Sequence, residues 1–266
     1  RLWRNPGPPF STDWVEYLDL SGGSSLVLPP AQRLVVADLD VDGRLDVAVG
    51  DEGGTVHAWR NPDTAPFSGG WGTGLSLGSV TGDLGSIFGA DVDNDATLEL
   101  VGTQRGTPSR ITVWKSGDEP FAAPWTAHSI GTDDGLLATA RPADLDHDGD
   151  RDIVTIGSGG ISGWPNELAP WAVGFVSSGH VAGVNDTRII AMAVSDLDRD
   201  GDTDLVTGEL NNSRIMAWQN DRTPFDGVWT GHQVITATHW GLQTLKAGDL
   251  DDDGDTDLVS GYYWDE

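Results

Sequence analysis

The stretch DLDHDGDRD, residues 144–152, has close relatives at four other places in the chain. They are DLDVDGRLD from Asp38, DVDNDATLE from Asp91, DLDRDGDTD from Asp196 and DLDDDGDTD from Asp249. The first aspartates of successive loops are 53, 53, 52 and 53 residues apart. A repeat this regular predicts that each unit is one supersecondary block stacked on its neighbours.

The repeated loops, numbered 1 to 5 here, carry acidic side chains at positions 1, 3, 5 and 9, with glycine at position 6. Only loop 2 departs, with Ala96 and Glu99, and we expect Ala96 to adopt a positive φ. Four carboxylates, a backbone carbonyl at position 7 and a water would supply the six to eight oxygens that Ca²⁺ takes. The absence of Cys and the scarcity of His argue against zinc or copper.

We therefore predict about five structural Ca²⁺ ions, because Mg²⁺ prefers fewer protein ligands. The predicted metal-binding residues are Asp38, Asp40, Asp42, Arg44 and Asp46; Asp91, Asp93, Asp95, Thr97 and Glu99; Asp144, Asp146, Asp148, Asp150 and Asp152; Asp196, Asp198, Asp200, Asp202 and Asp204; Asp249, Asp251, Asp253, Asp255 and Asp257. The loops are not EF-hands, since none has Glu at position 12 and each is followed by a short β-branched run in place of a helix.

One repeat is predicted to form four strands. In the second repeat these are an apolar run ending at Ala90, then Leu98–Gly102, Arg110–Trp114 and Trp125–Ile130. Four short antiparallel strands per unit are typical of a propeller blade.

The two ends of the chain are predicted to form the fifth blade together. RLWRN at Arg1 matches the third-strand endings HAWRN at His57 and MAWQN at Met216, whereas Glu266 follows the second strand of the last repeat. We therefore expect an all-β, five-bladed β-propeller with four-stranded antiparallel blades, forming a single domain over 1–266. Blade 5 would combine about 1–20 with 240–266, so that the N-terminal strands close the ring and remove exposed sheet edges.

These loops, the FGAD segment at Phe88 and the recurrent third-strand tryptophan resemble FG-GAP/VCBS repeats, the calcium-binding propeller blades of integrin α heads, of secreted bacterial proteins and of some lyases and lectins. The resemblance implies the propeller fold, bound calcium and an extracellular setting. It does not imply one activity, because such repeats occur in lectins, adhesins and enzyme domains. The departures are Ala96, Glu99 and a ring of five where seven is commoner.

The formal charge of −27 excludes nucleic acid and anionic membranes as favoured partners, although 20 of the 42 acidic residues lie at the loop positions named above. No apolar run approaches the roughly 18 residues of a membrane helix. Weak calcium sites of about 0.1 to 1 mM fill outside the cell. We therefore expect a secreted or cell-surface, monomeric ring that does not insert into membranes.

Ten of the twelve tryptophans follow the repeat and are predicted to pack between blades. Trp240 and Trp264 break the pattern, and their loops are predicted to emerge on the face opposite the acidic loops. We predict a ligand site from His239, Trp240, Tyr262, Tyr263 and Trp264, whose rings suit the apolar face of a sugar. The alternative is that these residues fasten the seam of the ring.

The sequence contains no recognisable catalytic constellation. It favours a non-catalytic binding or adhesion module for a glycan or an extracellular protein. The alternatives are a polysaccharide lyase or hydrolase using Tyr262, Tyr263, His239 and Arg105 or Arg188, and a structural repeat within a larger secreted assembly.

Overall fold

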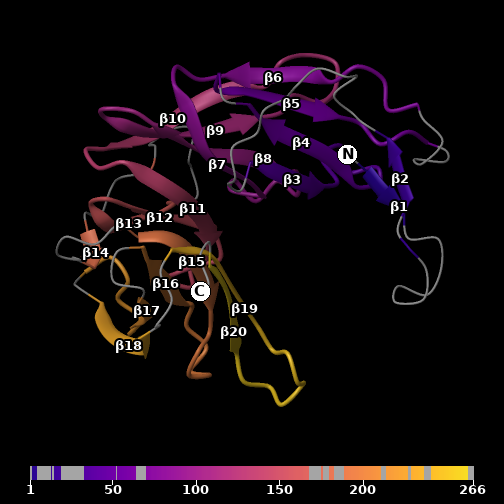
Figure 1. The fold of residues 1–266 in the computed structure, drawn as a ribbon. Coiled ribbons are helices and arrows are strands. Elements are labelled where there is room, and N and C mark those ends of the chain that lie inside the picture. Colours follow the sequence, from indigo (N-terminus) through magenta and orange to yellow (C-terminus); the bar gives the residue numbers. More distant parts are fainter. Residues whose placement is uncertain are drawn as a thin grey trace.

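The computed structural model describes residues 2–4, 13, 15–18, 33–51, 53–63, 70–167, 175, 180–182, 189–210, 214–226, 229–236 and 241–262. Within these ranges every regular element is a β-strand, which confirms the all-β prediction. Figure 1 shows the sheets following one another along an arc in the order of the sequence.

Four sheets have four antiparallel strands each and correspond to the first four repeats, termed units 1 to 4. Unit 1 contains β3 (Leu34–Ala37), β4 (Asp46–Gly50), β5 (Thr55–Trp59) and β6 (Leu75–Ser79). Unit 2 contains β7 (Asp83–Ala90), β8 (Glu99–Arg105), β9 (Ser109–Lys115) and β10 (Thr126–Asp133). Unit 3 contains β11 (Leu137–Ala143), β12 (Asp152–Gly157), β13 (Gly160–Trp164) and β14 (His180–Ala182). Unit 4 contains β15 (Ile189–Ser195), β16 (Asp204–Glu209), β17 (Arg214–Gln219) and β18 (Thr230–Thr236).

Each acidic loop joins the first and second strands of its unit, as predicted. The second strands β4, β12 and β16 are buried along their whole length. Neighbouring units cover both faces of the sheet at β12 and β16, whereas Val47 and Val49 of β4 pack against Trp59 and Trp71 of their own unit. Their runs of Val, Ile and Leu suit such two-sided burial. The strands therefore hold both ends of each acidic loop on a rigid frame.

The hydrophobic core lies between successive sheets. One cluster contains Ala48 of unit 1 and Ile87 of unit 2, and further clusters join units 2 and 3, 3 and 4, and 4 and 5. The third-strand residues Trp114, Trp164 and Trp218 belong to clusters shared with the preceding unit. For these three tryptophans the predicted packing between units is confirmed.

The two ends of the chain form two-stranded sheets. β1 (Leu2–Arg4) pairs with β2 (Val15–Leu18), and β19 (Leu242–Gly248) pairs with β20 (Asp257–Tyr262). These two sheets are separate in the hydrogen-bonded topology, and Figure 1 places them at opposite ends of the arc. Closure of the ring by a fifth blade therefore remains a prediction.

Candidate metal centres

The acidic loops are organised by the carboxylate at position 9, which accepts a hydrogen bond from a backbone N–H group in every loop and is buried in loops 1 to 4. In loop 3, Asp152 Oδ2 accepts from Leu145 N at 2.9 Å, and Asp152 Oδ1 accepts from Asn166 N at 2.8 Å. The other four loops repeat the first of these bonds at 2.8 to 3.0 Å. The side chain at position 9, within the second strand, thus holds the start of each loop by a hydrogen bond. The sequence predicts only a metal-binding role for this side chain.

The loops bring carboxylates from different positions close together. The groups whose oxygens lie within 4.8 Å of one another are Asp38, Asp40 and Asp42; Asp91, Asp93 and Glu99; Asp144, Asp146 and Asp152; Asp196, Asp198 and Asp204; Asp249, Asp251 and Asp257. Positions 1 and 3 therefore converge in all five loops and position 9 in four of them. At position 5, Asp95 and Asp253 accept hydrogen bonds from the backbone N–H two residues later, each at 2.8 Å.

Three of these clusters contain a buried carboxylate oxygen that accepts no hydrogen bond from the described residues. These atoms are Oδ1 of Asp40, Oδ1 of Asp144 and Oδ1 of Asp196. Burying a carboxylate oxygen without a partner is costly, and a bound cation is one remedy. Oxygen-only donor sets of this kind fit Ca²⁺, so the residues present agree with the predicted metal. The clusters show that a cation could be held, whereas the number of ions remains a prediction.

Backbone conformation confirms one detail and adds another. Ala96 has a φ of 69°, as predicted for the alanine that replaces glycine at position 6. Position 4 also has a positive φ, between 57° and 63°, in all five loops, although none of them has glycine there. The β-branched Val41 is the least suited of these residues to that region. The same backbone turn therefore recurs in each loop in spite of different side chains at position 4.

In loop 2 a lysine reaches into the carboxylates, as Arg60 does at the equivalent place in loop 1, where it ion-pairs with Asp40 and Asp42. Lys115, the last residue of β9, places Nζ 2.5 Å from Asp93 Oδ2, 2.7 Å from Asp95 Oδ2 and 3.1 Å from Glu99 Oε1. The hydrogen bond from Lys115 lowers the pKa of Asp95 to about 2. The ammonium group thus supplies positive charge to the loop whose sequence departs most from the repeat.

Loop 3 has no basic residue at the equivalent place, because Pro165 follows the third-strand Trp164. Burial raises the pKa of Asp152 to about 7. A carboxylate with such a pKa needs a nearby cation to stay ionised in the folded protein at neutral pH. Loop 3 therefore has more to gain from a bound metal ion than loop 2.

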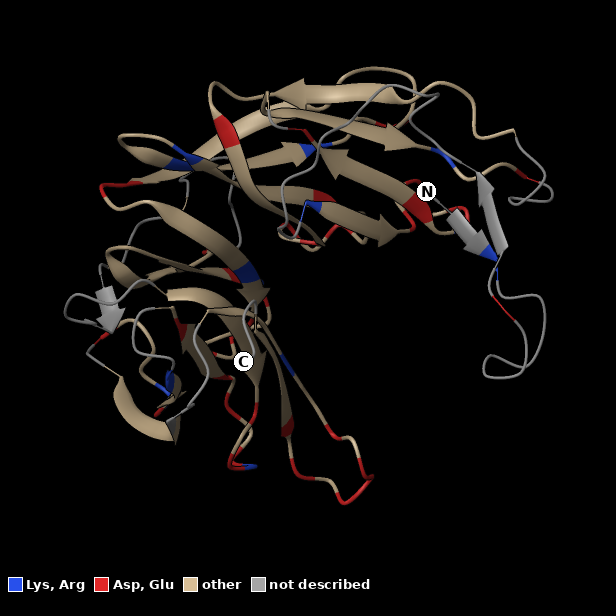
Figure 2. Ribbon diagram, viewed as in Figure 1, with Lys and Arg blue, Asp and Glu red and all other residues tan. Residues whose placement is uncertain are grey.

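Neighbouring loops contact one another through the side chain at position 4. The contacts are Asn94 Nδ2 to Gly149 O at 3.2 Å, His147 Nε2 to Asp202 Oδ1 at 3.4 Å, Arg199 Nε to Gly254 O at 3.0 Å and Arg199 Nη2 to Asp255 Oδ1 at 2.5 Å. Loops 2 to 5 thus lie side by side. Figure 2 shows the acidic loops after β15 and β19 extending together at the bottom of the view.

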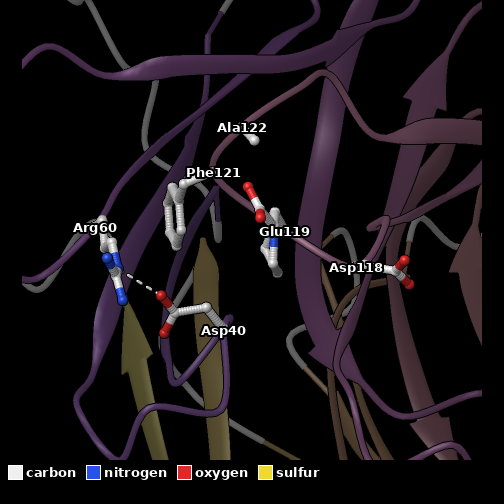
Figure 3. A pocket seen from close by; sticks show the side chains of 7 residues that line it. Asp40, Arg60, Asp118, Glu119, Phe121 and Ala122 are labelled. Carbon is white, nitrogen blue, oxygen red and sulfur yellow. Dashed lines mark hydrogen bonds and ion pairs between the residues drawn. The ribbon is translucent and has the colours of Figure 1, made fainter.

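An open pocket of about 410 Å³ lies beside loop 1. Its lining includes Asp40, Arg60, Glu119 and Phe121, so the pocket joins loop 1 to the turn before β10 (Figure 3). Arg60 Nε donates to Asp40 Oδ2 at 2.5 Å. The pocket offers one aromatic face and several hydrogen-bonding groups, and it was not anticipated from the sequence.

The predicted aromatic ligand site falls mostly outside the described residues. His239, Trp240, Tyr263 and Trp264 lie there, whereas Tyr262 is half-buried and packs against the core between units 4 and 5. Of the arginines considered for a lyase, Arg188 also lies outside. Arg105 is 3.8 Å from Asp83 in an ion pair between Nη1 and Oδ2. Across the described ranges, no helix is long and apolar enough to cross a membrane.

A family model described as an FG-GAP-like repeat matches residues 91–155 and 174–260. Among solved structures, an Agrocybe aegerita lectin that recognises non-reducing terminal N-acetylglucosamine is similar, with a TM-score of 0.55 and 20% identity over 85% of this chain and 59% of that one. A complex of BBS1N with ARL6DN gives a TM-score of 0.55 and 13% identity over 84% of this chain and 62% of that one. This chain spans about three fifths of these structures, and at such identities the likeness concerns the fold. No curated protein has a significantly similar sequence.

Proposed function

This chain belongs to the FG-GAP-like repeat family, and from that premise we propose that it is a calcium-stabilised, non-catalytic binding module that works outside the cell. The observation that carries this proposal is the recurrence of convergent carboxylates in all five loops, with unpartnered buried oxygens in three of them. Such sites stabilise a scaffold wherever free calcium exceeds their dissociation constants, which for weak sites means a secreted or cell-surface protein.

The carboxylates at positions 1, 3, 5 and 9 would hold the ion, together with the backbone carbonyl at position 7. Bound Ca²⁺ supplies positive charge that offsets the repulsion between the aspartates of one loop. Because adjacent loops contact one another through position 4, ordering one loop also fixes its neighbour. We expect loop 2 to bind calcium most weakly, since the Lys115 ammonium contacts the carboxylates at positions 3, 5 and 9, whereas Arg60 in loop 1 contacts positions 3 and 5.

The proposed scaffold is a five-bladed ring formed by the whole of 1–266. Units 1 to 4 have four strands each, whereas β1–β2 and β19–β20 have two each. Joining the two half-blades gives a fifth unit of the same size, built from about 1–20 and 240–266. The pairing would cover the free edges of both two-stranded sheets, which are otherwise prone to association with other chains.

The proposed ligand is a glycan or an extracellular protein. The predicted contact residues are His239, Trp240, Tyr262, Tyr263 and Trp264, whose rings suit stacking on a sugar. The pocket beside loop 1 is a second candidate position, because Phe121 offers an aromatic face next to Arg60 and Glu119. The Agrocybe aegerita lectin recognises terminal N-acetylglucosamine, so sugars with that end group are the first ligands to test.

A glycan-array experiment on the calcium-loaded chain tests this proposal. The parent is compared with a Trp240→Ala, Trp264→Ala double variant and with a Phe121→Ala variant, each checked for folding by its thermal melt. Loss of binding in one folded variant supports a glycan site at that position. If the parent binds no glycan, and no extracellular protein is retained on the immobilised chain, the binding-module proposal fails.

A further inference from the structure

The first unit of the arc exposes an apolar residue that every later unit buries. Leu34 of β3 lies four residues before the first aspartate of its loop and is 58% exposed. The residues at the same place in β7, β11, β15 and β19 are at most 1% exposed, and each packs against the preceding unit. They are Ile87, Ala140, Met192 and Leu245. Leu34 therefore faces the place where a preceding unit would lie.

The last unit shows the complementary feature on its opposite face. Val259 of β20 is 51% exposed, whereas the residues at its place in units 1 to 4 are fully buried against the following unit. These are Ala48, Val101, Val154 and Val206. Leu250, at position 2 of loop 5, is 66% exposed, although Leu39, Val92 and Leu145 at that position are buried. Val259 and Leu250 therefore face the place where a following unit would lie.

We propose that these two faces bind each other within one chain, with β3 packed on β20 and Leu34 against Val259. This inference rests on the five-bladed ring proposed above and specifies the contacts at its seam. Val259 and Leu34 would repeat the arrangement of Val154 and Met192, which share one buried cluster between units 3 and 4. The exposed apolar residues at both ends of the arc would then be covered, as their equivalents are elsewhere.

A side-chain hydrogen bond predicts the same register. Asn166, two residues after Trp164, donates from Nδ2 to the carbonyl oxygen of Val92 in the preceding unit at 2.6 Å. Asn220 makes the equivalent bond to Leu145 at 2.7 Å. In both cases the acceptor is position 2 of the preceding loop.

Asn61 is the corresponding residue of unit 1, two residues after Trp59. Its Nδ2 donates to Leu45 O at 2.9 Å, within its own loop. Asn166 and Asn220 make that bond too, in addition to the one between units. The second acceptor for Asn61 would be the carbonyl oxygen of Leu250, whose apolar side chain is exposed in loop 5.

The charges at the seam are also complementary. Compared with the other junctions, the acidic residue is at position 4 and the basic residue is at position 7. At two other junctions a basic or titratable side chain at position 4 meets an aspartate at position 7 of the next loop, as in His147 with Asp202 and Arg199 with Asp255. Loop 5 has Asp252 at position 4, and loop 1 has Arg44 at position 7. Asp252 would be repelled by the aspartate at position 7 of loops 3 to 5, so its favourable charged partner at that position is Arg44.

The N-terminal hairpin has a matching contact available in the fifth unit. The residue after the third-strand tryptophan contacts the position 3 aspartate of its own unit in the pairs Lys115 with Asp93 and Gln219 with Asp198. Arg4 follows Trp3 in β1, so its partner would be Asp251 of loop 5. The two ends are parts of one chain, which makes this encounter intramolecular and favours it over pairing with a second copy.

Disulfide trapping tests the seam, because the natural chain has no cysteine. A Leu34→Cys, Val259→Cys double variant is oxidised with diamide in calcium, and the products are identified by non-reducing electrophoresis and peptide mass. The Val154→Cys, Met192→Cys variant is the matched positive control between units 3 and 4. We expect an intramolecular disulfide in monomeric protein, at a yield near that of the control.

Two results would overturn the inference. A disulfide that forms only between two molecules would assign these faces to a second copy, and no disulfide under conditions that oxidise the control would show that the faces do not meet. In a parallel measurement, Asp252→Arg and Arg44→Asp should each lower the Tm by about 2–4 °C. Arg44 also ion-pairs with Asp42 and Asp63 in its own unit, so combining the two substitutions should restore only the part of the loss that comes from the seam. Neither readout includes a glycan, so trapping can fail while glycan binding persists, and glycan binding can fail while the seam is trapped.

Discussion

The side chain of Asn166 in unit 3 is bonded to the backbone of Val92 in unit 2, with 2.6 Å between Nδ2 and the carbonyl oxygen. Both residues are buried, so no bulk water can replace this bond. The bond joins the end of one unit's third strand to the neighbouring acidic loop. It therefore couples the packing of adjacent units to the geometry of a candidate metal centre.

Replacing Asn166 with Ala should lower the free energy of unfolding by about 1–3 kcal/mol, because the Val92 carbonyl would be left buried without its donor. The backbone bond from Asn166 to Asp152 does not involve the side chain and should remain. Urea titration in the presence of calcium measures the change. Glu167→Ala, at the exposed neighbouring position, is the control, and an equal effect of both substitutions would contradict this role of Asn166.

Replacing Gly131 with Ala should destabilise the contact between units 2 and 3. A Cβ at this position of β10 would collide with the ring of Trp164, which is fully enclosed in the core. Overpacking of this kind costs about 1–3 kcal/mol. Gly117→Ala is the matched control, since a Cβ there meets nothing within 4 Å. Equal melting temperatures for the two variants would show that the ring of Trp164 can move aside.

Much of the scaffold could be predicted because it depends on local pattern. The 53-residue spacing predicted the units, and the repeated third-strand tryptophan predicted the contacts between units that Trp114, Trp164 and Trp218 make, whereas Trp59 packs within its own unit. The positive φ of Ala96 was predicted because glycine occupies the same position in the other loops. Position 4 also has a positive φ, but its residues share no property that would reveal this in the sequence.

The contacts that Lys115 and Asn166 make with distant loops could not be predicted in the same way. Lys115 is 16 residues beyond Glu99, and it reaches loop 2 only because β8 and β9 pair as they do. The reach of Asn166 to Val92 spans 74 residues and depends on how two units stack. Tertiary packing, and not local sequence, decides which cation meets each carboxylate and which donor meets the Val92 carbonyl.

Removing calcium should lower the thermal stability of the chain steeply. At a free calcium concentration tenfold above the dissociation constant, each occupied site contributes about 1.4 kcal/mol. The unpartnered oxygens of Asp40, Asp144 and Asp196 are the atoms that would lose their cation. Scanning calorimetry in calcium and in excess chelator measures the difference, with magnesium as the control ion. A Tm that is unchanged by chelation would refute a structural role for the loops.

Replacing Lys115 with Met should strengthen calcium binding at loop 2. In the parent an ion must displace the ammonium group from Asp93, Asp95 and Glu99, and a partly buried ion pair at such distances is worth roughly 1–4 kcal/mol. We expect the affinity of this loop to rise about tenfold or more, which corresponds to at least ~1.4 kcal/mol. Equilibrium dialysis with metal analysis would show the gain as a higher calcium content at limiting ion concentration.

Gln219→Met is the matched control for Lys115→Met, because Gln219 takes the equivalent place in unit 4, at the end of β17, and donates to Asp198 of loop 4 at 2.6 Å without carrying a charge. Its removal should change calcium binding much less. In chelator, Lys115→Met should melt below the parent. The variant lacks the internal cation that offsets three carboxylates, and no calcium ion is present to replace it. Calcium contents that are equal in the parent and in Lys115→Met would mean that the ammonium group does not compete with the ion.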